Sequence, residues 1–355
     1  MNPTFTSMHL LFIVLRPFSW LYGLILKLRH RLYDTGFWKS ESGPVTTIVI
    51  GNLELGGTGK TPMTDKILHI LKGHLKVALL SRGYGRKTKG YRDVVTESPP
   101  AEVGDEPLLI KRMHPDVPVA VCEDRLRGLE QLAENHVLDL VVLDDAFQHR
   151  PLHSGFNILL TPYDRPFWDN ALVPEGRLRD VKERARYAHA IVVTKCPAQL
   201  SAQEMESMRE SAAWYSTAPV HFARIDYGAL RSITHPEEPK DWPQSVVLFS
   251  GIADDSLLHD YVASKSDVLE VKKFSDHHQY TPHELRMLME ICANFAGRDP
   301  VLVTTAKDAV KIRGLLGDTG DPQVEILELP IEVSFMTEGL EEMIRAYART
   351  NKRNS

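Results

Sequence analysis

Residues 46–66, TTIVIGNLELGGTGKTPMTDK, constrain the fold more than any other stretch of the chain. A short, uncharged and β-branched run at 45–50 predicts a buried strand, and apolar residues at helical spacing from Met63 to Leu71 predict a helix. The glycines between them allow left-handed backbone and let successive N–H groups point at an anion. This order of strand, glycine-rich loop and helix is that of a phosphate-binding P-loop.

The loop carries the residue types that bind a nucleotide and its metal. Lys60 would neutralise phosphate charge, and Thr61 would place a hydroxyl at the helix N-terminus, where it can bind Mg²⁺. The usual pattern G-x-x-x-x-G-K-[ST] begins with a glycine, but this chain has Glu54 there. A glycine-rich turn without a ligand is the alternative, and the flanking strand and helix favour the nucleotide. The predicted nucleotide-binding residues are Gly56, Gly57, Thr58, Gly59, Lys60 and Thr61.

Composition places the chain among ordinary globular proteins. Its 355 residues suffice for two domains, and it is 43% hydrophobic and 25% charged. A formal net charge of -5 argues against a dedicated nucleic-acid binder, which usually carries a basic excess. The cysteines Cys122, Cys196 and Cys292 lack metal-ligand spacing, so we expect a structural role in a reducing compartment.

The first forty residues differ from the rest of the chain. Two apolar runs, 8–15 and 18–28, are separated by Arg16 and Pro17 and are followed by a basic cluster at 27–31. A membrane-spanning helix needs about twenty mostly apolar residues, so we predict a helix that lies in the membrane interface, with its basic residues near anionic lipid. No small-residue cleavage site of a signal peptide follows. The alternative is an amphipathic helix that packs on the domain.

From residue 44 onward strands and helices alternate, which predicts a doubly wound α/β fold. A polar interval with three prolines at 232–244 is typical of a linker and precedes a second, smaller α/β pattern. We therefore expect a membrane-interface region at 1–40, a P-loop domain at 41–231, a linker at 232–244 and a smaller α/β domain at 245–355. The expected strands are 76–80, 118–122, 140–143, 156–160, 190–194, 220–225, 245–249, 301–305 and 324–329. The expected helices are 106–113, 125–135, 202–214, 338–350 and one that begins after Thr281 with a capping box.

Two carboxylates follow an apolar strand in the sequence LVVLDDAFQHR at 140–150. Such a position is that of a Walker B strand, so Asp144 and Asp145 are candidates to hold Mg²⁺ or its water shell. The alternative is a pair of aspartates that cap the following segment. The spacing does not decide which of the two contacts the metal.

Other polar motifs stand at the expected ends of strands and helices. Asp105 in GDEP, at 104–107, can accept a proton from an attacking hydroxyl, or it can be the N-cap of the following helix. His277 and His278 in FSDHHQY, at 274–280, can orient a catalytic group, or they can form a surface pair. Metal binding by these adjacent histidines is disfavoured. The sequence SRGYGRK at 81–87 suits phosphate binding or a solvated basic loop.

The motifs in their order resemble one known family, the tetraacyldisaccharide 4'-kinases, which act on a lipid A precursor. The resemblance spans nearly the whole chain, and the set is far more specific than the P-loop alone. Its motifs are GNLELGGTGKTP (51–62), SRGYGR (81–86), GDEP (104–107), DRLRG (124–128), LDDAFQHR (143–150), PEGRLRD (174–180), FSDHHQY (274–280) and TAKDAVK (305–311).

The resemblance implies a P-loop NTPase-like fold and an ATP- and Mg²⁺-dependent reaction in lipid A biosynthesis. The γ-phosphoryl group would pass to the 4'-hydroxyl of a tetraacyldisaccharide 1-phosphate, which yields lipid IVA. The partners would be this glycolipid and the membrane surface, at the cytoplasmic face of the bacterial inner membrane. By the same resemblance, Lys60 and Asp105 are catalytic, with Asp105 the base and His277 its partner, and Asp144 and Asp145 are the metal-associated pair. Arg82 and Tyr84 would face the nucleotide and acceptor, and Asp180 stands where the family pattern has a glutamate, so a metal role at that position is not assigned.

Two other classes share the P-loop. In an NTPase switch or metallochaperone, residues 194–195 or 307–308 would read a guanine base. A non-enzymatic membrane adaptor would keep a nucleotide-binding fold without catalysis. Neither class accounts for GDEP, LDDAFQHR and FSDHHQY in one chain.

Overall fold

The computed structural model describes residues 3–153, 155–234, 239–252, 254–276, 278–295, 297–316 and 324–351, with side chains from residue 14 onward. Its contacts divide the chain into two compact units. Unit 1 consists of residues 1–82, 122–225 and 333–355, and unit 2 consists of residues 83–121 and 226–332. Each unit is therefore built from segments that are far apart in the sequence.

Unit 1 is organised around a largely parallel sheet. Within it the strands follow the order β17–β10–β9–β8–β2–β6–β3, and the pairs from β10 to β3 are parallel. Every residue of the central strand β2 is buried, as a strand covered on both faces requires. The predicted doubly wound α/β class is confirmed. The bounds are β2 (Thr47–Asn52), β3 (Val77–Ser81), β6 (Leu140–Asp144), β8 (Phe156–Pro162), β9 (Ala190–Thr194), β10 (Val220–Tyr227) and β17 (Ile331–Phe335).

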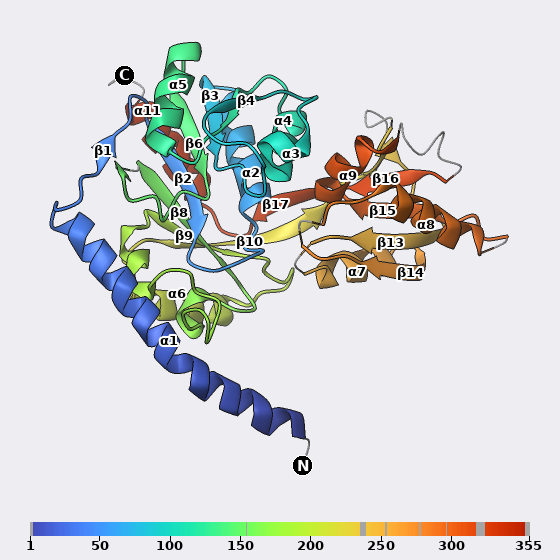
Figure 1. The fold of residues 1–355 in the computed structure, drawn as a ribbon, viewed down its shortest axis with the longest axis horizontal. Helices are drawn as coiled ribbons and strands as arrows, with labels where there is room; N and C mark the ends of the chain where they lie inside the picture. The colour runs from blue at the N-terminus through green and yellow to red at the C-terminus, as the bar shows by residue number, and fades with distance from the viewer. Residues whose placement is uncertain are drawn as a thin grey trace. The chain divides into compact units, whose positions relative to one another are not determined.

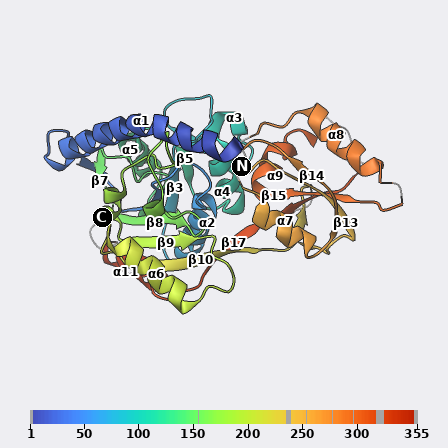
Figure 2. The ribbon, with the colours of Figure 1, turned by 90° about the horizontal axis from the view of Figure 1, so that it is seen from below.

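Helices cover the sheet of unit 1 on both sides. Figure 2 shows α1 on one side of the strands and α6 and α11 on the other. The short strands β1 (Glu41–Ser42) and β7 (Leu152–His153) form a parallel pair of their own. The helices are α1 (Pro3–Asp34), α2 (Lys60–Lys72), α5 (Arg125–Asn135), α6 (Ala202–Ala213) and α11 (Leu340–Asn351), with 3-10 turns at Phe167–Asp169 and Lys182–Tyr187.

Helix α1 is one long helix that continues through Pro17 (Figure 1). One face packs on the rest of unit 1: the Ser19 hydroxyl donates to the Leu172 carbonyl at 3.0 Å, and buried His30 contacts Asp180 at 2.6 Å. The predicted alternative, a helix that packs on its domain, is thus confirmed for this face. Large apolar side chains on α1 are nevertheless exposed, namely Val14, Phe18, Trp20, Leu21, Leu24, Ile25 and Leu28. Among the described residues, no helix is long and apolar enough to cross a membrane.

Unit 2 contains a six-stranded sheet in the order β12–β11–β16–β15–β13–β14. Alternate residues of β13 enter two different cores: Val247 and Phe249 pack with α8 and α9, whereas Val246 and Leu248 pack with α7. The sheet therefore carries helices on both faces. Its strands are β11 (Leu230–Ser232), β12 (Pro239–Lys240), β13 (Ser245–Ser250), β14 (Asp267–Lys273), β15 (Val301–Thr305) and β16 (Ile326–Leu329), and its helices are α7 (Ser256–Ala263), α8 (Pro282–Ala293) and α9 (Ala306–Arg313).

The N-terminal segment of unit 2 supplies the GDEP motif. Strand β4 (Arg92–Val94) pairs antiparallel with β5 (Val119–Val121), and α3 (Pro100–Val103) and α4 (Asp105–Met113) lie between them in the chain. Helix α4 packs against α9 of the same unit. This packing brings residues 105–106 and 307–311 together.

The expected boundaries of the P-loop domain at 41–231 and of the smaller domain at 245–355 do not coincide with the two units. Strand β17 joins the large sheet, and α11 packs on α2, so the last part of the chain belongs to unit 1. The segment 83–121 belongs instead to unit 2. The expected linker at 232–244 includes β12, which pairs antiparallel with β11. Hydrophobic periodicity predicts the elements, but long-range pairing decides which unit each one joins.

Candidate active site

The P-loop runs between the last residue of β2, Asn52, and the first residue of α2, Lys60. Gly56 and Gly59 both adopt a φ of 83°, in the left-handed region that glycine enters without strain. Gly59 is the N-cap of α2, and it is glycine that allows this conformation directly before the helix. Gly57 is not among the positive-φ glycines of the described residues.

Buried hydrogen bonds fix the position of the loop. The Asn52 amide donates to the Thr58 hydroxyl at 2.8 Å, and the Thr194 hydroxyl donates to the Thr58 carbonyl at 2.9 Å. Thr58 is only 1% exposed. Because its carbonyl and its side chain are both held by neighbouring strands, the loop is pre-organised at the end of β2.

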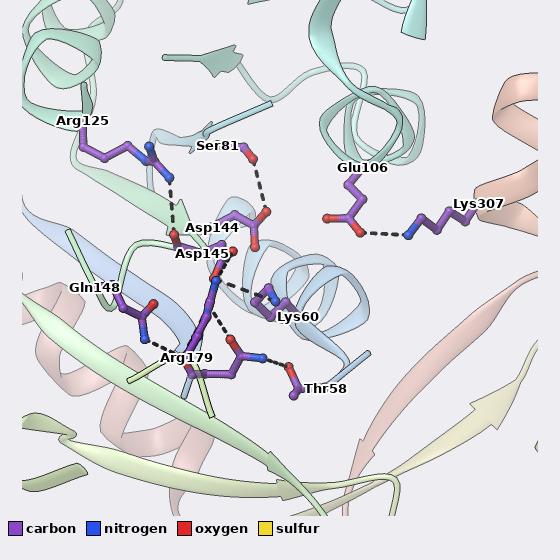
Figure 3. A network of polar contacts seen from close by, with 11 residues as sticks. Thr58, Lys60, Ser81, Glu106, Arg125, Asp144, Asp145, Gln148, Arg179 and Lys307 are labelled. Atoms are coloured by element: carbon purple, nitrogen blue, oxygen red, sulfur yellow. Dashed lines mark hydrogen bonds and ion pairs between the residues drawn. The ribbon is translucent and has the colours of Figure 1, made fainter. Parts of the chain in front are cut away.

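A charged network surrounds the loop, and Figure 3 shows its members pointing toward one another. The Lys60 ammonium lies 3.8 Å from Asp145 Oδ1. Arg179 Nη1 donates to Asp145 Oδ2 at 3.0 Å, and Nη2 contacts both Asp145 Oδ1 and the Asn52 side-chain oxygen. The Gln148 amide donates to the Asn52 carbonyl at 2.7 Å. Arg179 therefore links the residue after β6 to the start of the P-loop.

Asp145 is an ionised carboxylate in this setting. Burial alone would raise its pKa, but Lys60, Arg179 and Arg125 outweigh burial and lower the pKa to about 2. Its backbone is also left-handed, with a φ of 50°, which is uncommon for a residue other than glycine. A strained backbone held by a charged network is typical of functional sites.

Asp144 ends β6 and is 5% exposed. Its Oδ2 accepts a hydrogen bond from the Ser81 hydroxyl, at the end of β3, at 3.2 Å. Next to it, buried Arg125 donates from Nη2 to the Asp145 carbonyl at 3.3 Å and from Nη1 to the Glu123 carbonyl at 3.0 Å. Arg125 interacts electrostatically with both aspartates.

Within the described residues, no group of three or more His, Cys, Asp or Glu side chains is arranged to hold a metal ion. A Mg²⁺ site that uses two aspartates, one hydroxyl and ATP phosphates would not require such a group, because Mg²⁺ keeps waters and substrate oxygens among its ligands.

Glu54 occupies the position of the missing glycine and is 1% exposed. Neither of its side-chain oxygens has a hydrogen-bond partner among the described residues. Burial raises its pKa to about 7, although Arg165, Asn170 and Arg177 oppose this rise. Glu54 thus differs from Asp145, because burial favours the neutral form of Glu54 whereas nearby cations favour the ionised form of Asp145.

In unit 2, Gly104 and not Asp105 is the N-cap of α4, with a φ of 91°. The alternative that made Asp105 the cap is therefore wrong. Its buried carboxylate lies 3.4 Å from the ammonium group of Lys311, and the next residue, Glu106, contacts Lys307 at 3.0 Å (Figure 3 shows the latter pair).

The histidine motif is only partly described. His277 lies outside the described residues, so its predicted pairing with Asp105 stays a prediction. His278 Nε2 lies 3.0 Å from Glu284 Oε1, and its ring stacks on Phe274. Glu284 also completes the predicted capping box with Thr281, which is confirmed.

The structure places the remaining sequence candidates as follows. The Arg86 guanidinium donates to the Gly90 carbonyl within its own loop at 2.7 Å, and Tyr84 is 68% exposed. Asp180 is fully buried and contacts His30 of α1, so its carboxylate joins α1 to unit 1. The three cysteines are free and buried, as expected for structural thiols.

The guanine-reading alternative depended on residues that have other partners. The Thr194 hydroxyl donates to the P-loop carbonyl of Thr58. Asp308 is completely buried, and its carboxylate accepts from the Gly251 N–H at 2.9 Å. These side chains are part of the framework of each unit.

Sequence reasoning missed several residues of the charged networks. Arg179 and Lys311 lie in two motifs of the family resemblance, PEGRLRD and TAKDAVK. No pattern in the sequence indicated the partners of these two residues. Both are cations that the fold brings near a candidate carboxylate of another motif. Such pairings become visible only when the fold brings distant segments together.

Comparison with known proteins assigns the chain to a family. The family described as Tetraacyldisaccharide-1-P 4'-kinase matches residues 11–349. A tetraacyldisaccharide 4'-kinase of Cytophaga hutchinsonii is 40% identical over 309 residues, which cover 86% of each chain. One from Phocaeicola vulgatus is 34% identical over 356 residues, which cover 96% of each chain.

The fold gives the same result. A crystal structure of LpxK from Aquifex aeolicus in complex with ATP is similar with a TM-score of 0.75 at 30% identity, and the match covers 96% of this chain and 99% of that one. The motif-based resemblance is confirmed, and this chain belongs to the tetraacyldisaccharide 4'-kinase family.

Proposed function

We propose that this chain transfers the γ-phosphoryl group of ATP to the 4'-hydroxyl of tetraacyldisaccharide 1-phosphate. Residues of the P-loop would bind ATP, and Asp105 would accept the proton of the hydroxyl. The chain is an ATP-dependent 4'-kinase of lipid A biosynthesis. The observation that carries the assignment of its site is the network of Lys60, Asp145 and Arg179 around a P-loop with two left-handed glycines.

We assign ATP binding to the loop from Gly56 to Thr61, that is, Gly56, Gly57, Thr58, Gly59, Lys60 and Thr61. The left-handed glycines leave room for phosphate oxygens at the backbone, and the N-terminus of α2 favours negative charge. Lys60 is the cation that would neutralise charge on the transferred group. In phosphoryl transfer such positioning and charge neutralisation supply most of the rate.

The residues at this loop fit Mg²⁺, which prefers oxygen ligands. Asp144, Asp145 and the Thr61 hydroxyl are the candidates. The Asp145 oxygens contact Arg179 and Lys60, and Asp144 Oδ2 accepts a hydrogen bond from the Ser81 hydroxyl. When bound, the ion would neutralise charge on the β- and γ-phosphate oxygens.

We assign the proton acceptor for the 4'-hydroxyl to Asp105, with His277 as its partner. The carboxylate stands at the first residue of α4, directly after a glycine with positive φ, and it lies 3.4 Å from the Lys311 ammonium group. This position and this contact support the assignment of Asp105 as the proton acceptor.

The test is transfer of labelled γ-phosphate from ATP to a disaccharide 1-phosphate acceptor in detergent. For Asp105→Asn we expect a kcat loss on the order of 10² to 10⁴, with ATP affinity within about threefold of wild type. The loss has this size because the amide cannot accept the proton but keeps the shape of the side chain. A wild-type kcat would remove Asp105 from the mechanism.

We also propose that the exposed apolar face of α1 contacts the cytoplasmic surface of the inner membrane, where the acceptor lipid resides. The face includes Phe18, Leu21, Ile25 and Leu28, each at least half exposed. Burying such side chains in an interface contributes roughly 1.5–3 kcal/mol each. The double variant Leu21→Glu/Ile25→Glu should therefore lose at least about 100-fold in binding to anionic phospholipid vesicles.

The matched control for this surface is Val137→Glu, which adds a carboxylate at an apolar residue that is 78% exposed outside α1. It should bind vesicles as wild type does. Unchanged sedimentation of the α1 double variant with vesicles would refute the membrane contact but leave the catalytic assignment standing.

A further inference from the structure

The TAKDAVK motif of α9 has no role in the mechanism so far, yet it brings a cation to the candidate base. Lys311 Nζ lies 3.4 Å from Asp105 Oδ2 and 3.3 Å from Asp308 Oδ1. The three side chains are 2%, 6% and 0% exposed. Lysine is almost never buried to this degree unless it is paired, so the position of Lys311 is tied to these two carboxylates.

Asp308 is itself fixed. Its Oδ2 accepts from the Gly251 N–H at 2.9 Å, after β13, and from the Thr305 hydroxyl at 2.8 Å, at the end of β15. A side chain at Gly251 would come within 3.0 Å of Asp308 Oδ1, so this glycine lets the backbone approach. Asp308 therefore anchors the Lys311 ammonium to two strand ends of unit 2.

A second ion pair lies one turn earlier on α9. Lys307 contacts Glu106 at 3.0 Å and Asp276 at 3.5 Å. Burial alone would lower the pKa of Lys307, but Glu106, Asp105 and Asp276 raise it, so this lysine is also charged. The charged groups that face Asp105 are thus Lys311, Asp308, Lys307 and its own neighbour Glu106. Lys311 contacts Asp105 directly.

We propose that Lys311 is a positioning residue for catalysis: its ammonium group, anchored by Asp308, holds the Asp105 carboxylate in place for the acceptor hydroxyl. The inference rests on the proposed function of Asp105 and adds a residue to it. In the transfer step the bond from O4' to phosphorus forms, the bond from phosphorus to ADP breaks, and the hydroxyl proton passes to Asp105. A cation within about 4 Å favours the charged form of a carboxylate and so keeps it able to accept this proton at neutral pH.

The experiment measures kcat against pH for the full-length protein with ATP and the disaccharide 1-phosphate acceptor. Lys311→Met keeps most of the side-chain volume and removes the charge. The acid limb of the kcat profile should move to higher pH by about one unit, which means a loss of kcat of up to about tenfold on the acid side of the profile that shrinks as the pH rises. Lys311→Arg should keep the wild-type limb. A merely structural role would lower kcat by the same factor at every pH.

The matched control is Arg313→Met, which removes a partly buried ion pair with Glu328 from the same helix without touching Asp105. Its acid limb should stay where it is in wild type. Lys311→Met leaves the buried carboxylates of Asp105 and Asp308 without this cation, which can destabilise the fold. The double variant Asp308→Asn/Lys311→Met is therefore also measured, because it removes one charge of each sign. The double variant should keep the shifted limb.

Two outcomes separate this inference from the proposed function. If Asp105→Asn loses kcat but both Lys311→Met and the double variant keep the wild-type acid limb, Lys311 has no positioning role and Asp105 remains the base. If Asp105→Asn keeps the wild-type kcat, the base assignment is wrong and the inference falls with it.

Discussion

Asp145 in unit 1 and Asp105 in unit 2 are both acidic side chains held by cations, but the cations differ. Both carboxylate oxygens of Asp145 accept hydrogen bonds from the Arg179 guanidinium, and the Lys60 ammonium lies 3.8 Å from Asp145. Asp105 lies 3.4 Å from the ammonium group of Lys311. A guanidinium offers a rigid fork with fixed geometry, whereas an ammonium group acts as a point charge.

The difference suggests different tasks for the two carboxylates. Arg179 contacts both oxygens of Asp145 and also binds Asn52. We therefore expect Asp145 to help fix the geometry of the P-loop. Contact with a point charge at Asp105 does not impose a fixed two-point geometry on the carboxylate, which suits a group that accepts a proton. Breaking either arrangement should therefore give a different kinetic signature.

Between the two cation partners, Arg179 and Lys311, the larger effect is expected from loss of the forked contact. Arg179→Met leaves Asp145 without its two-point partner and removes the Arg179 contact of the Asn52 side-chain oxygen, because one guanidinium serves both. We expect kcat/KM for ATP to fall on the order of 10²- to 10³-fold, as for the loss of a charged hydrogen-bond partner. Arg179→Lys should recover only part of this loss, since lysine keeps the charge but not the fork.

Arg177→Met is the matched control for this comparison. Arg177 lies two residues away and donates to the Leu55 carbonyl at 3.2 Å. It makes no contact with Asp145 in the interactions described here, so the variant should stay within about threefold of wild type. Equal losses in both variants would mean that any arginine near the loop suffices, which would remove the special role of the fork.

A smaller effect is expected at Glu54, a buried carboxylate whose oxygens have no hydrogen-bond donor among the described residues. Its pKa in the folded protein is raised to about 7 from an ordinary value of 4.5. A raised folded-state pKa means that its contribution to stability is fully present below pH 4.5 and is lost as the pH rises through 7. The free energy of unfolding should therefore fall by up to about 3 kcal/mol between pH 5 and pH 8 through this group.

Glu54→Gln removes this pH dependence because the amide does not titrate. Its free energy of unfolding should resemble that of wild type near pH 4 and exceed it by up to about 3 kcal/mol at pH 8, as measured by urea denaturation. Parallel curves for the two proteins across this pH range would show that Glu54 is ionised in the folded state and that the contrast with Asp145 does not exist.

Local patterns in the sequence predicted much of the fold. Strands 190–194 and 301–305 and helix 125–135 agree with the structure to the residue, because buried runs and capped amphipathic segments are local signals. Elements with mixed character were not predicted, such as the partly exposed strand β14 and the short helix α9. Strand β17 was also missed, and with it the return of the chain to unit 1.

Sequence patterns likewise predicted only part of the candidate site. Lys60, Asp144 and Asp145 were predicted because a P-loop and a strand ending in acids are contiguous motifs. Arg179 and Lys311 were not, because their partners lie 34 and 206 positions away along the chain and no periodicity encodes such a pairing. The guanidinium and ammonium partners of the two carboxylates are products of tertiary structure.

The most direct test of the account measures phosphoryl transfer by Lys60→Ala and Asp105→Asn side by side, with labelled ATP and the disaccharide 1-phosphate acceptor in detergent. If Lys60 serves the nucleotide and Asp105 serves the hydroxyl, Lys60→Ala should lose on the order of 10³-fold in kcat with weakened ATP binding. Asp105→Asn should lose kcat with ATP binding unchanged. Weakened ATP binding in Asp105→Asn, or wild-type transfer by either variant, would contradict this division of roles.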